Sequence, residues 1–214
     1  MLCIIQARLN SRRFKNKALH LIYGIPLIQH VINRVRKSKE ISKIIVSSSF
    51  KKSDNQLISY LKKNKTKFFR GDLENVALRL YETANIDRAK YFVRISGDSP
   101  MIDPNLIDKA IKISKKTKGH DIITNVFPRT FPKGQSVEVI KTFTLKKSLK
   151  NFSKTDKEHV TKFFYKNSKK FNIKNFVLNK KIKEIKMSID TKKDLKLILK
   201  KFDKKNFKNY SLKL

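Results

Sequence analysis

Three short apolar runs mark the first half of the chain, and each is followed by a polar loop. They are LCIIQ at 2–6, KIIVSSS at 43–49 and YFVRIS at 91–96. Runs of this length, bounded by polar residues, are typical of strands that are buried on both faces. A shorter run, TKFFRG at 66–71, predicts a further strand.

Amphipathic segments alternate with these strands. Apolar residues recur at helical spacing in 25–38, 53–64, 72–85 and 103–116. Ser53 is placed to cap the second helix, and the acidic residues of the third suit its first turn, where the helix dipole favours negative charge. Strands that alternate with helices predict an α/β fold, with a mostly parallel sheet covered on both faces.

The alternation becomes less regular after Lys118. Segment 126–136, with two Pro and one Gly, predicts a long ordered excursion that covers a pocket or contacts another subunit. We find no repeat, linker or hinge, so one domain is expected over 1–214. In this half we predict strands at 121–126, 135–140 and 185–190, and helices at 142–150, 156–168 and 191–203.

The single cysteine and the N-terminus bear on location. Cys3 cannot form an internal disulfide, which suits a reducing cytoplasm, and its apolar setting favours core packing over a role as nucleophile. The N-terminus lacks the features of a signal peptide, and no apolar run approaches the roughly 20 residues that cross a bilayer. We therefore expect a cytoplasmic protein without membrane insertion.

The formal net charge of +35 first suggests a nucleic-acid partner. Lysine supplies most of it and is spread widely, since residues 131–214 hold 25 Lys and no Arg. Abundant Ile, Asn and Phe indicate a codon bias toward A and T, which favours a solvated coat over a nucleic-acid surface. Readers of bases and phosphates prefer Arg with interleaved aromatic residues. No specific nucleic acid is expected as a partner.

Several common catalytic motifs are missing from the sequence. Neither a G-x-G-x-x-G fingerprint nor a P-loop is present, four scattered His and one Cys give no zinc ligand set, and there is no G-x-S-x-G elbow. The candidate chemistry therefore lies in a basic loop and in two aspartates.

The basic loop lies in IIQARLNSRRFKNKAL, residues 4–19. Cations gathered after a buried strand repel one another unless an anion lies among them. By itself the loop leaves a nucleotide, a nucleic acid and water as alternatives. Its cations, which surround Asn10 and Ser11, are Arg8, Arg12, Arg13, Lys15 and Lys17.

Asp98 and Asp190 are the candidate aspartates. Each follows a predicted strand, in RISGDSPMIDP and KMSIDTKKDL, and ligands bind at the carboxyl ends of parallel strands. If the carboxylates are close, they can share Mg²⁺, which takes one or two carboxylates plus phosphate oxygens and water. The structural alternatives are that Asp98 caps a turn and that Asp190 caps the next helix.

These segments resemble the CMP-sugar synthetases, the family of acylneuraminate- and Kdo-type cytidylyltransferases. Its opening signature reads roughly A-R-x-x-S-x-R-x-P-x-K-x-L, and Arg8, Ser11, Arg13, Lys17 and Leu19 match it. Further blocks resemble the branch of spore-coat polysaccharide cytidylyltransferase-like proteins, in family order and over about residues 3–200. They are GIPLIQHVINRV, FFRGDLENVALR, RISGDSPMIDP, RTFPKGQSVEV, EHVT and SIDTKKDL.

The resemblance implies a GT-A-like nucleotidyltransferase fold, a three-layer α/β/α sandwich with a mostly parallel mixed sheet. It implies that CTP and a sugar acid give CMP-sugar and pyrophosphate, with Mg²⁺ as cofactor, in the synthesis of surface polysaccharide or glycan. It also suggests a homodimer, formed through the 126–140 region.

The resemblance also implies roles for matching residues. Arg8, Lys17 and Asp98 would be catalytic, and Asp98 and Asp190 would ligate the metal. His159 is a candidate base, with a structural histidine as the alternative. The nucleotide-binding residues would be Ala7, Arg8, Ser11, Arg13, Lys17, Arg70 and Arg79, the last two in the cytidine pocket. The acceptor side would be lined by Asn125, Arg129, Glu138, Glu158 and His159.

The first loop departs from the family pattern at three positions. Asn10 and Asn16 replace Gly, and Asn tolerates positive φ better than other residues do, so the loop shape can survive. Lys15 replaces Pro, which predicts a loop that is more mobile before nucleotide binds.

Two other functions remain open from the sequence. One is nucleotidyl transfer to a neutral sugar or a polyol phosphate. The other is a non-catalytic polyanion-binding protein, whose binding would weaken steeply with salt, whereas a metal-bridged nucleotide site would depend chiefly on Mg²⁺. Asp98 beside the basic loop favours the enzyme, because a polyanion binder gains nothing from a carboxylate there.

Overall fold

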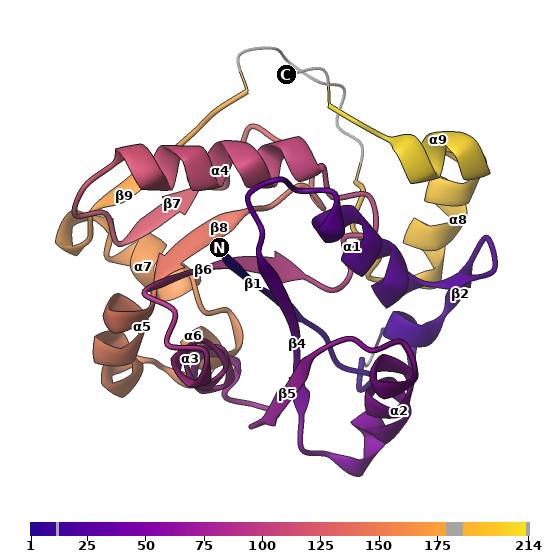
Figure 1. The fold of residues 1–214 in the computed structure, drawn as a ribbon, viewed down its shortest axis with the longest axis horizontal. Coiled ribbons are helices and arrows are strands. Elements are labelled where there is room, and N and C mark those ends of the chain that lie inside the picture. The colour runs from indigo at the N-terminus through magenta and orange to yellow at the C-terminus, as the bar shows by residue number, and fades with distance from the viewer. Residues whose placement is uncertain (12, 179–185, 213–214) are drawn as a thin grey trace.

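A computed structural model describes residues 1–11, 13–178 and 186–212 of the protein. Its centre is a seven-stranded sheet in the order β5-β4-β1-β6-β8-β7-β9 (Figure 1). Neighbouring strands are parallel except where β8 pairs with β6 and β7. The strands are β1 Leu2–Gln6, β4 Lys43–Ser49, β5 Phe68–Gly71, β6 Tyr91–Ser96, β7 Ile122–Thr124, β8 Glu138–Lys141 and β9 Ile173–Asn175, with a separate hairpin of β2 Leu21–Ile22 and β3 Ile25–Pro26.

The central strands follow the predicted apolar runs, and β1, β4 and β6 have the predicted bounds. Alternate side chains of a strand point to opposite faces, so Cys3 and Ile5 join one hydrophobic core while Leu2 and Ile4 join the other. Cys3 is fully buried, and this burial raises the pKa of its thiol. The expectation that Cys3 packs in the core is confirmed.

Helices cover both faces of the sheet (Figure 1). Helices α1, α2, α4, α8 and α9 contribute to one core, and α3, α5 and α7 contribute to the other. The expected three-layer α/β/α sandwich is confirmed. No helix in the described ranges is long and apolar enough to cross a membrane. The helices are α1 Leu27–Arg36, α2 Asn55–Lys63, α3 Val76–Ile86, α4 Pro104–Lys116, α5 Thr142–Ser148, α6 Lys154–Glu158, α7 Lys162–Lys166, α8 Lys192–Lys201 and α9 Lys204–Asn209.

Two helix starts differ from the prediction. Ser53 does not cap α2, because it lies inside a short 3₁₀ turn, Lys52–Asp54, that precedes the helix. The acidic residues of the predicted first turn of the third helix, Asp72 and Glu74, lie before α3, whose N-cap is Asn75. Asp72 instead accepts the backbone N–H of Asn75 at 2.7 Å and shapes the turn that leads into the helix.

The C-terminal half differs more. The described part of the predicted strand at 185–190 is irregular, because its N–H groups donate to loops: that of Met187 to the carbonyl of Lys133 at 2.7 Å, and that of Ile189 to the carbonyl of Asp98 at 2.9 Å. The predicted helix at 156–168 is broken between α6 and α7. Strand β9 and helix α9 were not predicted.

Candidate functional site

Two adjoining hollows lie where the parallel strands end, and Ser96 and Asp98 line both. The first hollow, about 670 Å³, lies between the loop after β1, the end of β6 and helix α6. The second, about 770 Å³, lies between segment 126–136 and the start of α7. The first hollow brings together eight of the predicted site residues: Ala7, Arg8, Ser11, Arg13, Lys17, Asp98, Glu158 and Asp190.

The loop after β1 folds back on itself around Leu9. The carbonyl of Leu9 accepts the N–H of Ser11 at 2.8 Å and that of Asn16 at 3.2 Å. Asn16 has φ 55°, a left-handed conformation that Asn tolerates better than other side chains with a Cβ. This turn brings Lys17 back to the first hollow, which Arg8 also lines.

Lys17 contacts both predicted aspartates. Its Nζ is 3.3 Å from Oδ2 of Asp98 and 3.7 Å from Oδ1 of Asp190. Because both oxygens contact the same nitrogen, they are at most about 7 Å apart. The fold therefore joins two carboxylates that nothing local in the sequence brings together.

Asp190 has two further cationic partners, Arg13 and Lys186. Arg13 Nη2 lies 3.1 Å from Oδ1 of Asp190, and Lys186 Nζ lies 2.9 Å from Oδ2. Burial alone raises the pKa of Asp190, but the hydrogen bond from Lys186 and the charges of Lys17, Lys186 and Arg13 outweigh it and hold the pKa below its ordinary value. Cations thus compensate the repulsion between the two carboxylates.

The structural alternative for Asp190 does not hold, since Thr191 is the N-cap of α8. The Thr191 hydroxyl accepts the N–H of Asp194 at 3.1 Å, and the Asp194 carboxylate accepts the N–H of Asp190. Asp98 does take part in a local contact, because the hydroxyl of Ser99 donates to its Oδ1 at 3.2 Å. Asp98 Oδ2 and Asp190 both face the first hollow.

A divalent cation fits these carboxylates on chemical grounds. The described ranges contain no group of three or more His, Cys, Asp or Glu side chains that could hold a metal. Asp98 and Asp190 already converge on one cation, the ammonium of Lys17. Two hard carboxylates are also what Mg²⁺ uses when phosphate oxygens and water complete its shell. These two residues are the candidate metal ligands.

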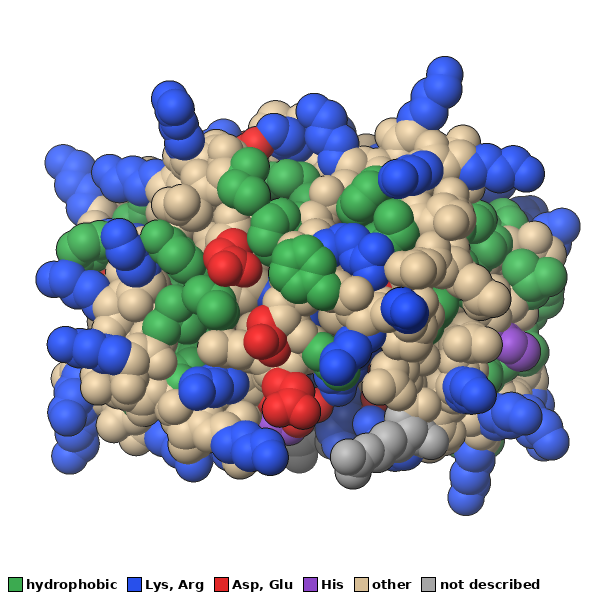
Figure 2. All heavy atoms as spheres, turned by 90° about the horizontal axis from the view of Figure 1, so that it is seen from below, with side chains coloured by type: hydrophobic (Ala, Val, Ile, Leu, Met, Phe, Trp, Pro, Cys, Tyr) green, Lys and Arg blue, Asp and Glu red, His purple; other side chains and the backbone are tan. Residues whose placement is uncertain are grey.

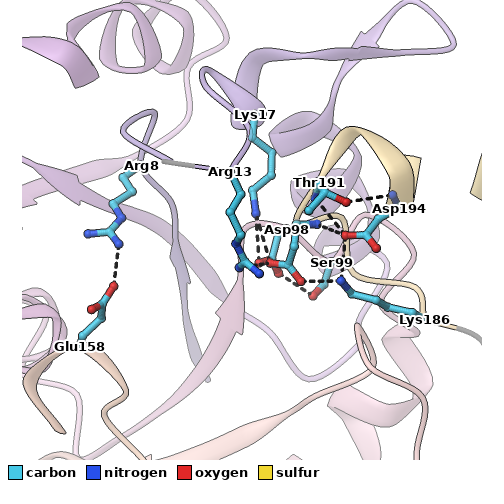
Figure 3. A network of polar contacts seen from close by, with 10 residues as sticks. Arg8, Arg13, Lys17, Asp98, Ser99, Glu158, Lys186, Thr191 and Asp194 are labelled. Carbon is cyan, nitrogen blue, oxygen red and sulfur yellow. Dashed lines mark hydrogen bonds and ion pairs between the residues drawn. The ribbon is translucent and has the colours of Figure 1, made fainter. Parts of the chain in front are cut away.

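Arg8 and Glu158 form an ion pair of 2.8 Å at the first hollow (Figure 3). Arg8 also donates to the carbonyl of Leu73 at 3.4 Å. Glu158, expected on the acceptor side, lines the first hollow and not the second. The break after α6 explains this, because it lets Glu158 and His159 face different hollows.

Arg79 was expected in the cytidine pocket but is fully buried and lines neither hollow. Its guanidinium donates to the backbone carbonyls of Asp72 and Leu73. Burial lowers the pKa of Arg79 to about 10, and the nearby charge of Arg8 adds to this effect. Because Leu73 lines the first hollow, these bonds place Arg79 behind that wall of the hollow.

Two further predicted residues also lie outside both hollows. Arg70 donates from Nε to the carbonyl of Ser49 at 2.9 Å, so it fixes the loop after β4. Asn125, expected on the acceptor side, is fully buried, and its amide bonds the backbone of Gln135 at 2.7 Å and of Val137 at 2.9 Å. Sequence position alone did not separate these structural contacts from ligand contacts.

The second hollow holds the remaining predicted acceptor residues, Arg129, Glu138 and His159. Most of the charged side chains that line this hollow are Lys or Arg. Within the described part of the chain, four of them form no ion pair with a carboxylate: Arg129, Lys133, Lys162 and Lys166.

Glu138 is nearly buried and already neutralised. It accepts from Arg94 at 2.5 Å and from the hydroxyl of Tyr165 at 2.6 Å. Burial raises the pKa of Tyr165 well above its ordinary value, and the charge of Glu138 raises it further. The ring of Phe127 stacks on that of Tyr165 at a centroid distance of 4.9 Å. Glu138, Tyr165 and Phe127 all line the second hollow.

The sequence did not single out Lys186, Arg94 or Tyr165 as site residues. Lys186 carried no signal in so lysine-rich a chain. Arg94 did carry one, because an arginine inside an apolar strand needs a partner within the protein. Tyr165 carried no signal, because nothing in the sequence pattern shows that its hydroxyl meets Glu138.

Comparison with known proteins agrees with this geometry. A family model described as cytidylyltransferase matches residues 2–211. An uncharacterized protein of Methanocaldococcus jannaschii is 34% identical over 199 residues, which are 92% of this chain and 80% of that protein.

Two relatives with named functions match over shorter stretches. Spore coat polysaccharide biosynthesis protein SpsF of Bacillus subtilis is 31% identical over 52% of this chain and 48% of its own length. A 3-deoxy-manno-octulosonate cytidylyltransferase of Geobacter sulfurreducens is 34% identical over 50% of this chain and 42% of its own length. The matches span less than half the length of these two relatives.

A solved structure of a cytidylyltransferase from Leptospira borgpetersenii superposes with a TM-score of 0.89 and 25% identity, over 98% of this chain and 90% of that one. Its similarity confirms the nucleotidyltransferase fold. Because the family model matches nearly the whole chain and the fold agrees with it, the chain belongs to the cytidylyltransferase family.

Proposed function

We propose that the protein transfers CMP from CTP to a sugar acid and releases pyrophosphate, with Mg²⁺ as cofactor, in the synthesis of surface polysaccharide or glycan. The observation that carries this proposal is the meeting of Arg8, Lys17, Asp98 and Asp190 at the first hollow. Cations beside paired carboxylates are suited to a reaction that develops negative charge on phosphate oxygens.

The reaction needs one displacement at the α-phosphorus. An acceptor oxygen attacks it, the bond to the oxygen of the β-phosphate breaks, and pyrophosphate leaves. Arg8, Arg13 and Lys17 would neutralise the triphosphate and the departing pyrophosphate, with Ser11 assisting. Asp98 and Asp190 would hold Mg²⁺, which would supply further neutralisation of phosphate charge.

No protein nucleophile is needed, so no covalent enzyme intermediate is expected. His159 lines the second hollow, where an acceptor hydroxyl would lie, and remains the candidate base. The second hollow adjoins the first through Ser96 and Asp98, so an acceptor there would approach the α-phosphate.

An acidic acceptor is supported by the charge of the second hollow. Arg129, Lys133, Lys162 and Lys166 line it, and Glu138 is neutralised by Arg94. A carboxylate or phosphate on the acceptor would find partners here. The matches span less than half the length of the two named relatives, so the acceptor class is part of the proposal. We also propose a homodimer that forms through the 126–140 region.

Polyanion binding is the second candidate, and the surface charge bears on it. Figure 2 shows Lys and Arg side chains around the whole of one face, with acidic side chains near its middle. Such a spread supports a solvated coat more than one binding stripe. We therefore favour the enzyme.

The test is pyrophosphate release with each of the four NTPs and Mg²⁺, against panels of sugar acids, neutral sugars and polyol phosphates. We expect turnover with CTP and a sugar acid, and strong discrimination against UTP, which lacks the exocyclic amine of cytosine. Equal use of CTP, GTP and ATP would contradict cytidylyl transfer. Turnover with polyol phosphates alone would replace the acceptor class.

A further inference from the structure

Asp54 is a fully buried carboxylate that no step above uses. Its Oδ1 accepts the backbone N–H of Leu9 at 2.7 Å. Its Oδ2 accepts the hydroxyl of Ser48 at 3.0 Å, the N–H of Ser49 at 3.0 Å and the hydroxyl of Ser49. Four donors therefore converge on one side chain.

Asp54 connects the end of β4 to the loop after β1. It lies in the 3₁₀ turn after β4, and Ser48 and Ser49 are the last residues of that strand. Leu9 belongs to the loop after β1, the neighbour of β4 in the sheet. Although Asp54 is the N-cap residue of α2, its side chain makes no capping bond to that helix. The carboxylate thus serves the loop and the strand end instead of its own helix.

Leu9 is the anchor of the basic loop. Asp54 holds its N–H, its carbonyl holds the N–H groups of Ser11 and Asn16, and its side chain is 1% exposed. Arg8 directly precedes this anchor, and Lys17 directly follows Asn16. A shift of Leu9 would therefore move both proposed triphosphate cations together.

The donors around Asp54 suit a side chain that accepts hydrogen bonds at both of its oxygens. All four groups around Asp54 can donate, and a carboxylate only accepts. An asparagine would turn an NH₂ toward at least one N–H donor. A buried negative charge is tolerated when it is well hydrogen-bonded, and beneath the basic loop it also offsets the repulsion among the cations there.

We propose that Asp54 is a positioning residue that preorganises the basic loop for the triphosphate through the Leu9 amide. This inference rests on the proposed function. Holding reacting groups in place before the reaction saves the cost of ordering them, and a displacement of about 1 Å can lower the rate about 100-fold.

Asp54→Asn tests the proposal, with Asp108→Asn as the matched control. Asp108 also accepts a serine hydroxyl, from Ser38, and loop amides, from Lys39 at 3.1 Å and Glu40 at 3.2 Å, but at the amino end of β4. Kinetics would be measured at a temperature where thermal denaturation shows both variants to be folded.

For Asp54→Asn we expect kcat/KM for CTP to fall about 10- to 100-fold, with the KM of the acceptor within about twofold of wild type. Asp108→Asn should lose stability and keep both constants within about twofold. If Asp54→Asn loses stability and keeps its CTP kinetics, Asp54 is only structural and the proposal is wrong.

Two further measurements keep the test independent of folding and of the reaction. Ser49→Ala removes one donor to Asp54 without burying a new polar group. We expect kcat/KM for CTP to fall in this variant too, but less than in Asp54→Asn. Unchanged CTP kinetics in Ser49→Ala would count against the proposal. Hydrogen exchange of the Leu9 amide should speed up in both site variants and not in Asp108→Asn. A wild type without cytidylyl transfer would refute the proposed function, whereas an unchanged Leu9 amide would refute the tether.

Discussion

Arg8 and Glu158 lie 2.8 Å apart although 150 residues separate them in the chain. Their contact occupies the guanidinium that we propose for the triphosphate. If Arg8 binds the triphosphate as proposed, Glu158 competes with phosphate for the guanidinium, and nucleotide binding has to displace Glu158.

Glu158→Gln should tighten CTP binding as a result. Exposed ion pairs contribute about 0–1 kcal/mol, so we expect the Kd for CTP to fall by up to about fivefold in calorimetric titration. Glu40→Gln is the control, because Glu40 pairs with Lys115 at 2.6 Å away from the hollow. Weaker CTP binding in Glu158→Gln would show that Glu158 helps to hold the nucleotide.

Arg8→Ala and Lys17→Ala should each lower kcat by at least about 100-fold, the scale for removing one preorganised stabiliser of transition-state charge. Lys15→Ala should cost far less, since Lys15 is exposed and lies outside the first hollow. Pyrophosphate release measures all three. Full activity in both site variants would remove the triphosphate assignment.

Asp98→Asn and Asp190→Asn should abolish Mg²⁺-dependent turnover. With Mn²⁺ as the probe and CTP present, electron paramagnetic resonance should show free Mn²⁺ in both variants and bound Mn²⁺ in wild type. Both variants should remain folded, because Lys17 keeps one carboxylate partner in each. Wild-type Mn²⁺ binding in either variant would remove that residue from the metal site.

Gly134→Ala should disturb the segment that carries Asp190. Gly134 has φ 96°, and a Cβ there would lie 2.5 Å from the backbone of Met187 and Ser188. Gly119→Ala is the control, since Gly119 has φ 70° with nothing within 4 Å of an added Cβ. Both should lose about 1–2 kcal/mol in urea unfolding from the left-handed backbone. Only Gly134→Ala should lose more and also lose turnover.

Acid should weaken the fold through Asp194. Burial alone raises the pKa of Asp194, but hydrogen bonds from Lys186, the backbone and Thr191 outweigh it and lower the pKa. A carboxyl with a lowered folded-state pKa contributes stability above about pH 4, and this is lost as pH falls through the folded value. Urea unfolding between pH 5 and 3 should show a smaller loss for Asp194→Asn than for wild type. Equal losses would contradict the shift.

The sequence predicted the first half of the fold well for a clear reason. In β1, β4 and β6 both faces are buried, so the apolar run and the strand coincide. Strand β9 has no fully buried residue, which leaves no such run to detect. Segment 186–190 has apolar Met187 and Ile189 fully buried, yet its N–H groups bond to loops, and no pattern of apolar residues reveals that.

The candidate site was predictable where it depends on strand ends. Arg8, Lys17 and Asp98 follow parallel neighbours β1 and β6, so their residues necessarily share one edge. Arg79 and Asn125 could not be told apart from ligand contacts, because their burial is set by tertiary packing. Asp54 was missed because its contact with the basic loop is made through the backbone N–H of Leu9, and a backbone contact has no sequence signature.

The reversed direction of β8 has a consequence for how such a protein can diversify. Because β8 alone runs against its neighbours, Glu138 at its start lies at the same edge as the ends of β6 and β7. Most of the lining of the second hollow therefore comes from two stretches of the chain, 126–138 and 159–166. The lining of the first hollow comes mainly from the N-terminal half of the chain. If the acceptor binds in the second hollow, as we propose, then substitutions in these two stretches can change which acceptor is used while the first hollow stays as it is.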